Sequence, residues 1–403
     1  MQQHVESIFA GLPERIRVEM LEPAFTEPEV LQRVEKITGM NSDLLLCVAI
    51  HGASARALTL AVVKSQLPAV LWCHDQAHSL ASSALASEAL RQLCHPHILL
   101  HGKVEKVTRE LGVAAYAAAA KHRLSTARIG QLGLTHFNLI SAAVNPLLLQ
   151  ARFGTWVVPL ALEAFRSARK HIDPARIVKR VADIHSAYDV DVEQGLLEQV
   201  AGVQLAIEEL GDFHRLDAIA VNCWNEIVPD TGVSPCLGFA GGSYRVVCES
   251  DLAAAVTMLA GEALCGNPGY VGDFCSFDEE TGTAKLLHCA GYSDLHAGCQ
   301  RMKIVRQVCP AGQKGSVVAC RPILPEGPAV CVQLHGKELD LLHLRRCQIL
   351  RTEFPEQMQV DVQIEGDKGG FIREAAGNHY VIFPGDTENA WRTWAQWSMI
   401  QVH

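Results

Sequence analysis

Two carboxylates and one imidazole stand where regular structure is expected to begin or end. Glu226 follows an apolar, strand-like run, Asp251 lies between such a run and an alanine-rich stretch, and His379 opens a further apolar run. Together they form a hard, oxygen-rich donor set, which suits Mn²⁺ or Mg²⁺ better than Zn²⁺.

Each of these positions also has an ordinary structural explanation. Glu226 fits an exposed loop glutamate, and Asp251 fits a helix N-cap. A lone histidine at the start of a strand, such as His379, is more often a hydrogen-bonded structural residue than a ligand. Residue type and position alone leave both explanations open.

The elements that must position these residues begin with alternating strand and helix signals. Unbroken apolar runs separated by amphipathic stretches are typical of a parallel sheet with right-handed crossovers. In the first 125 residues the expected strands are 43–50, 69–74 and 97–101, and the expected helices are 53–66, 83–94 and 104–123. A second series begins at 127–133, with helices expected near 158–170, 174–187 and 193–210 and a strand at 218–223.

The pattern changes near residue 244. After one more strand and a helix at 251–264, short strand-like runs bounded by turn residues indicate an antiparallel barrel or sandwich. These runs are 284–289, 304–309, 316–321, 329–334, 348–354, 358–364 and 379–383, and a helix carrying Trp391, Trp394 and Trp397 follows from Thr387. The expected fold is therefore α/β. Two Rossmann-like parallel-sheet domains (1–125 and 126–243, the second ending in the Glu226 segment) precede a β-rich, barrel-like domain (244–403).

Composition excludes several classes of function. The chain has 403 residues, a net charge of −9 and no dense basic run, so nucleic acid is not expected as a partner. The glycine-rich segment 238–242 lacks the setting of a dinucleotide loop, so no nucleotide cofactor is expected. No apolar run is long enough to span a membrane and no signal peptide is visible. The 14 cysteines contain no CxxC pair, and we expect reduced thiols in a cytoplasmic protein.

The part of the chain from roughly residue 215 to residue 390 carries a series of short motifs. They are Cys223-Trp224-Asn225-Glu226, Ser234-Pro235-Cys236, Cys248-Glu249-Ser250-Asp251, Val256-Thr257-Met258-Leu259, Gly272-Asp273, His288-Cys289-Ala290-Gly291 and Gly377-Asn378-His379. This series resembles the C-terminal half of the L-fucose isomerase family, which is related to the L-arabinose isomerases. The N-terminal half resembles the family only in its strand–helix order, and the chain is shorter than the long fucose isomerases.

The resemblance implies a metal site and a reaction. It places the family's metal ligands on Glu226, Asp251 and His379, and it makes the two carboxylates the acid/base pair as well. The ion implied is Mn²⁺, with Mg²⁺ or Co²⁺ as alternatives. The resemblance also implies a homo-oligomer, a trimer or a hexamer, in which the first domain of a neighbouring subunit completes the site.

Other residues are weaker candidates for binding the substrate. Trp224 could stack on a sugar face or belong to the core, and the remaining candidates are His288, Asp273 and Asn378. Residues at strand ends of the first domain could form the wall supplied by a neighbour; these are His51, Arg56, His74, Asp75 and His78.

From the resemblance we expect an aldose–ketose isomerase that acts on a monosaccharide or a modified hexose. The reaction would pass through an enediolate by proton transfer, or it would use a hydride shift. Three alternatives stay open. They are a metal-assisted epimerase on the same fold, a non-catalytic sugar-binding regulatory protein, and a periplasmic sugar-binding protein, against which the absence of a visible signal peptide counts.

Overall fold

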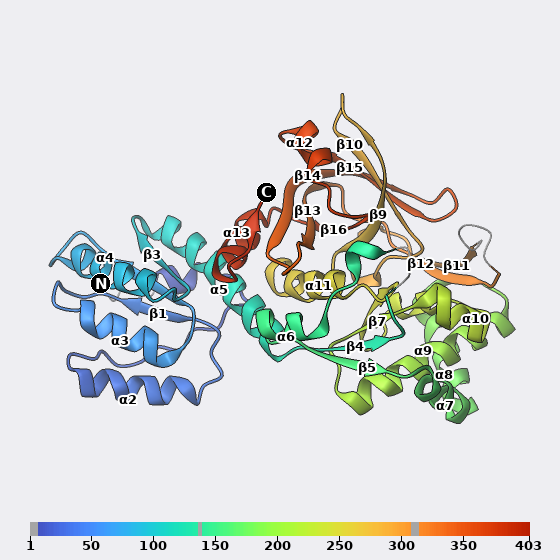
Figure 1. Cartoon of the computed structure of the whole chain (residues 1–403), viewed down its shortest axis with the longest axis horizontal. Coiled ribbons are helices and arrows are strands. Elements are labelled where there is room, and N and C mark those ends of the chain that lie inside the picture. The colour runs from blue at the N-terminus through green and yellow to red at the C-terminus, as the bar shows by residue number, and fades with distance from the viewer. Residues whose placement is uncertain (1–6, 136–138, 308–313) are drawn as a thin grey trace. The chain divides into compact units, whose positions relative to one another are not determined.

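The computed structural model describes residues 7–135, 139–307 and 314–403 (Figure 1). The chain divides into two compact units. The first unit is Met1–His122 with Asn389–Met399, and the second is Arg123–Glu388 with Ile400–His403. The four-stranded parallel sheet and the barrel described below both lie in the second unit. The division into three domains stays a prediction.

The first unit is built on a three-stranded parallel sheet in the order β1-β2-β3, as the strand and helix signals predict. A core of Ala, Val and Leu side chains joins the sheet to its helices. The strands are β1 (Leu45–Val48), β2 (Ala69–Cys73) and β3 (His97–His101), and the helices are α2 (Glu27–Thr38), α3 (Ala55–Ser65), α4 (Ser79–Gln92) and the first part of α5 (Val104–Thr126). Most of α13 (Glu388–Trp397) also belongs to this unit.

Helix α2 shows how local sequence sets these boundaries. Thr26 and Glu29 form a capping box at its start, in which each side chain binds the other residue's backbone N–H.

The second unit contains a four-stranded parallel sheet in the order β5-β4-β7-β8. Its strands are β4 (Arg128–Leu132), β5 (Trp156–Leu160), β7 (Ala218–Val221) and β8 (Arg245–Cys248), and its helices include α6 (Pro146–Phe153), α7 (Leu162–His171), α8 (Pro174–Ala187) and α9 (Gln194–His214). The helix expected near 158–170 begins later, at Leu162, because β5 occupies the first part of that segment. The remaining expected helices of this series are present.

A closed six-stranded antiparallel barrel follows (Figure 1). The order β13-β16-β9-β10-β15-β14 returns to β13, which pairs with β14 along nine positions. The strands are β9 (Tyr270–Asp278), β10 (Thr283–His288), β13 (Gly327–His335), β14 (Leu341–Glu353), β15 (Met358–Ile364) and β16 (His379–Pro384), with β17 (Gln401–Val402) added to β14 and the helix α12 (Lys368–Arg373) before β16. Of the two arrangements left open by the sequence, the structure has the barrel.

Two of the strand-like runs do not join the barrel. Strands β11 (Lys303–Gln307) and β12 (Val317–Arg321) pair with each other and with β6 (Asp189–Asp191), which precedes α9, in a separate three-stranded sheet. Alternation of apolar and polar residues indicates a strand, but it does not encode the strand's partner.

Helix α11 (Leu252–Cys265) connects the sheet to the barrel. It packs against β7 and β4 of the parallel sheet and against β16 and β13 of the barrel. Contact on both sides explains why the helix is buried and apolar almost all the way round. None of the helices in the described ranges combines the length and hydropathy that a bilayer span requires.

Candidate active site

Glu226 lies just beyond the carboxyl end of β7, where ligands gather in open parallel sheets. It belongs to a single π-helical turn, Cys223–Ile227, which Asn222 caps by accepting the N–H of Asn225. Such turns are frequent at functional sites. The Glu226 carboxylate accepts the N–H of Leu134 at 3.2 Å and lies against the backbone of Gly133, in the loop after β4.

A strained turn follows the neighbouring strand β8. Glu249 and Ser250 both adopt left-handed backbone angles, with φ of 60° and 57°. Non-glycine residues hold this conformation only where the surroundings enforce it. Here the buried Ser250 hydroxyl donates to the carbonyl of Gly133 at 3.0 Å, and its N–H donates to the carbonyl of Val221 at 3.1 Å. The turn is therefore fixed to the end of β7 and to the loop after β4.

Asp251 directly follows this turn and has two roles. Its Oδ1 accepts the N–H of Ala254 at 2.9 Å, so the expected N-cap of α11 is present. Its Oδ2 lies 2.9 Å from Nδ1 of His379, the first residue of β16. The contact joins the end of the parallel sheet to the barrel.

His379 is buried among carboxylates. Its other ring nitrogen, Nε2, lies 3.5 Å from Glu249 Oε2 and 3.6 Å from Asp273 Oδ1. Burial opposes the charged ring, but the hydrogen bond to Asp251 and the surrounding carboxylate charges outweigh burial and raise the pKa of His379 to about 9. The site therefore attracts positive charge.

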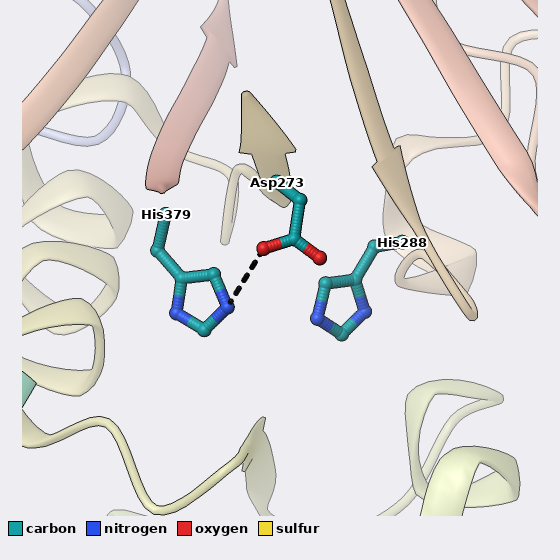
Figure 2. A group of neighbouring side chains, drawn as sticks. All are labelled: Asp273, His288 and His379. Atoms are coloured by element: carbon teal, nitrogen blue, oxygen red, sulfur yellow. Dashed lines mark ion pairs between the residues drawn. The ribbon is translucent and has the colours of Figure 1, made fainter. Parts of the chain in front are cut away.

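Strand register brings Asp273 and His288 to the same place. Asp273 lies on β9 and is the cross-strand partner of His379 on β16. On its other side Asp273 is paired with Leu287 of β10, and His288 is the next residue of that strand. Asp273, His288 and His379 each have one possible metal-ligand atom within 4.8 Å of those of the other two residues. Figure 2 shows the three side chains directed toward one space. Asn378 donates a hydrogen bond to Asp273 Oδ1.

Most of the predicted residues are thus brought together. Asp251, Asp273, His288 and Asn378 surround His379. Glu226 follows the adjacent strand β7 and accepts a hydrogen bond from the loop after β4, which also anchors Ser250. Trp224 is buried at 9% exposure, and its role in sugar binding stays a prediction. Glu249 was not predicted as a site residue. The only sequence signal for it is an acid at a strand end, two residues before Asp251.

A pocket borders the Asp251–His379 pair. Polar groups from the barrel and from the segment after β4 line it beside the apolar start of α11. The polar lining residues are Ser141, Asp251, Thr257, Gln333, His335, Asn378 and His379. Gln333 also fixes the start of β16, because its amide donates to the carbonyl of His379 at 2.9 Å. The pocket adjoins one side of the Asp251–His379 pair.

The first-domain candidates lie in the other unit, and their part in the site stays a prediction. Within that unit Asp75 pairs with His101 at 2.7 Å, and Arg56 pairs with Glu27 at 2.5 Å.

No protein-family model matches the chain. Three curated proteins named sulfoquinovose isomerase are similar to it. Those of Priestia aryabhattai and Priestia megaterium are 23% identical over 288 residues, which is 66% of this chain and 64% of each relative. That of Alkalicoccus urumqiensis is 22% identical over 280 residues, which is 66% of this chain and 63% of the relative. The chain therefore matches just under two thirds of the length of these relatives and resembles sugar isomerases at low identity.

Proposed function

We propose that the protein is an aldose–ketose isomerase that acts on a monosaccharide and uses a divalent metal ion. The observation that carries the proposal is the likeness to three proteins named sulfoquinovose isomerase. The structure supports it with the buried imidazole of His379, which carboxylates surround. Two of these, Glu249 and Asp251, follow the carboxyl end of the parallel strand β8.

The donor groups around His379 fit a divalent ion. Its Nε2 is buried and has no hydrogen-bond partner in the described part of the chain, although carboxylate oxygens of Glu249 and Asp273 lie near it. A buried nitrogen left without a partner costs free energy, and a cation would satisfy it. Carboxylate and imidazole donors suit Mn²⁺, the ion that the resemblance to the fucose isomerases implies, with Mg²⁺ or Co²⁺ as alternatives. When bound, such an ion supplies positive charge that stabilises the negative oxygens of an enediol-type substrate.

The side chains themselves would bind the sugar and move its proton. Isomerisation moves one proton from C2 of the aldose to C1 and a second from the hydroxyl on C2 to the oxygen on C1. A carboxylate on each side of the reacting carbons can carry out these transfers. We assign these transfers to Glu226 and Asp251. Glu226 is the more accessible of the two, because its side chain is only half-buried. Asp251 is 3% exposed and hydrogen-bonded, so its orientation is fixed.

For the substrate, we propose a sulfonated hexose, because the relatives are named sulfoquinovose isomerase. The alternative substrates are L-fucose and L-arabinose. The polar pocket beside Asp251 and His379 has room for hydroxyl groups and offers them amide, hydroxyl and imidazole partners.

The direct test is conversion of sugars by the purified full chain. The metal-free protein is incubated with sulfoquinovose, L-fucose or L-arabinose, with Mn²⁺ or with EDTA, and the products are identified by NMR. We expect a ketose from sulfoquinovose with Mn²⁺ and none with EDTA. Glu226→Gln should abolish conversion, whereas Glu163→Gln, a matched change at an exposed surface ion pair with Arg166, should not.

Two outcomes would contradict the proposal. An epimeric aldose in place of a ketose would make the protein an epimerase, and binding of the sugar without any conversion would make it a sugar-binding protein.

A further inference from the structure

Three histidines at one end of the barrel have a ring nitrogen without a partner. His335 ends β13, His343 lies on β14, and His403 follows β17. Within the described ranges, Nε2 of each ring is buried and makes no hydrogen bond. The rings of His335 and His403 are stacked, with their centres 5.4 Å apart. A buried polar atom without a partner costs free energy, so these nitrogens would gain from a ligand that forms hydrogen bonds with them.

Strand register explains why these rings gather. Leu341 of β14 is paired with His335 on one side and with Gln401 of β17 on the other. His343 lies two residues after Leu341, and His403 lies two residues after Gln401. Because side chains two residues apart on a strand point to the same face, all three histidines are on one face of the sheet.

His335 also lines the pocket that adjoins the Asp251–His379 pair. Gln333 lies two residues before His335 on β13, and it lines the same pocket. Its amide donates to the carbonyl of His379 at 2.9 Å. The pocket therefore joins the carboxylate-rich site to the histidines of the barrel.

The two parts of the pocket differ in charge. Around His379, the carboxylates of Glu249 and Asp273 add to the negative charge of the site. The ring stacked on His335 is another imidazole, which carries no negative charge. A sulfonate is a permanent anion whose oxygens only accept hydrogen bonds. It is therefore favoured beside imidazole N–H groups and repelled by the carboxylates.

His335 is suited to an anion that arrives with the substrate. Burial, followed by the nearby His403, lowers the pKa of His335, and the carboxylate of Asp340 opposes this shift with a smaller effect. At neutral pH the ring is therefore mostly uncharged and carries one N–H. A sulfonate oxygen can accept this N–H, and the negative charge of the sulfonate favours a second proton on the ring.

We propose that His335 binds the sulfonate of the substrate, with His403 as a positioning residue that holds the ring by stacking, and that this contact selects a sulfonated hexose over its neutral analogue. The inference rests on the proposed function, which places the reacting carbons at Glu226 and Asp251. With the sulfonate at His335, the other end of the sugar faces these carboxylates. A site built to hydrogen-bond one group rejects an analogue that lacks it, because the polar atoms of the site are then left unpaired.

Two sugars that differ only in the sulfonate test this assignment. The metal-free full chain is titrated calorimetrically with sulfoquinovose and with quinovose, the same hexose without the sulfonate. We expect the wild type to bind sulfoquinovose at least about tenfold more tightly, because the sulfonate adds a hydrogen bond to a charged group. His335→Leu should lose this difference and keep its affinity for quinovose.

Further variants separate binding from structure. His335→Gln retains an N–H donor and should keep part of the preference, whereas His171→Leu, at the exposed end of α7, should keep all of it. Circular dichroism checks the fold of each variant. Equal weakening of both sugars in His335→Leu would show a structural role, and an undiminished preference would show that His335 does not contact the sulfonate. Either result overturns the inference.

The positioning role of His403 has its own test. His403→Ala removes the stacked ring and should reduce the preference for sulfoquinovose, whereas His403→Phe keeps an aromatic ring and should retain most of it. Both variants should bind quinovose as the wild type does. An undiminished preference in His403→Ala would overturn the positioning role.

Failure of this inference is distinct from failure of the proposed function. A chain that selects sulfoquinovose through His335 but converts no sugar would keep this subsite and lose the isomerase. A chain that converts sulfoquinovose while His335→Leu keeps its preference would keep the isomerase and lose this subsite.

Discussion

Asp251 and His379 are 128 residues apart in the chain, yet Oδ2 of one lies 2.9 Å from Nδ1 of the other. The same aspartate caps α11, so a single side chain fixes both the start of a helix and the orientation of a buried imidazole. The structural and the functional explanation of Asp251, which the sequence leaves as alternatives, are therefore compatible.

The two roles of Asp251 can be separated by substitution. Asp251→Ala removes both, and loss of the cap alone should cost about 1 kcal/mol of unfolding free energy. Asp251→Asn keeps an oxygen for the N–H of Ala254, since asparagine caps as well as aspartate. We expect a lower melting temperature for the alanine variant than for the asparagine variant in metal-free protein, measured by calorimetry. Equal melting temperatures would show that the cap contributes nothing.

Gly261 should resist replacement by alanine. It lies inside α11, where alanine is normally favoured, but a Cβ there would come 2.0 Å from the ring of Phe383 on β16. Because β16 also carries His379, the clash should disturb the site. We expect Gly261→Ala to cost about 1–3 kcal/mol in urea unfolding and to weaken Mn²⁺ binding.

A matched control and a rescue accompany this variant. Gly202→Ala in α9 meets only Ile177, at an ordinary 3.6 Å, and should be neutral or stabilising. Adding Phe383→Leu to Gly261→Ala should recover part of the loss. If Gly261→Ala is as stable as the wild type, the packing of α11 on β16 is not as described.

Gly133 should matter for Glu226. Its φ of +82° disfavours any side chain, and a Cβ would lie 2.5–2.6 Å from the Glu226 carboxyl group. Gly133→Ala should therefore displace that carboxylate and lower isomerase turnover by about tenfold or more, since a small misplacement has large kinetic effects. Gly195→Ala, where a Cβ meets nothing within 4 Å, is the control. Unchanged turnover in Gly133→Ala would remove Glu226 from the catalytic machinery.

Acid should destabilise the barrel through His343. Burial, with a further contribution from the positive charge of Arg345, lowers the pKa of His343 to about 3. The ring is fully buried, with Nδ1 2.8 Å from the Tyr380 hydroxyl and Nε2 3.9 Å from the Glu374 carboxylate. Positive charge on His335 and His403 lowers the pKa of His343 further. The unfolded chain takes up a proton near pH 6.5 while the folded protein does not, so stability is complete above that pH and falls as pH decreases toward 3.

The size of this effect can be measured with one variant. Between pH 7 and pH 5 the proton uptake corresponds to about 2 kcal/mol of unfolding free energy. His343→Gln removes the titrating group, and we expect its urea midpoint to change less over this interval than that of the wild type. Parallel pH profiles for the two proteins would contradict the assignment.

The sequence predicted the strand–helix order of the first parallel sheet because continuous apolar runs and amphipathic stretches are local signals. It missed β5 in the second parallel sheet, and it indicated five of the six barrel strands but not β9, which carries Asp273. It did not indicate that β11 and β12 leave the barrel for β6, because partner choice depends on contacts distant in sequence. For the same reason the direct pairing of Asp273 with His379 could not be read from the sequence.

Glu249 shows a second limit. Its carboxylate lies near His379 because Glu249 and Ser250 adopt left-handed backbone angles. Glutamate and serine rarely adopt such angles, so the sequence does not predict this turn. Spacing identified the candidate acids, but the direction in which each side chain points depended on tertiary hydrogen bonds such as that from Ser250 to Gly133.

The position of α11 between the sheet and the barrel has a consequence for the order of assembly. Asp251 precedes His379 by 128 residues in the chain. The two side chains come together only when β16 has paired with β9 and β13. Pairings between such distant segments form late and slowly. We therefore expect the Asp251–His379 contact to form late in folding, so that the ion proposed above would bind a nearly native chain and stabilise it by mass action.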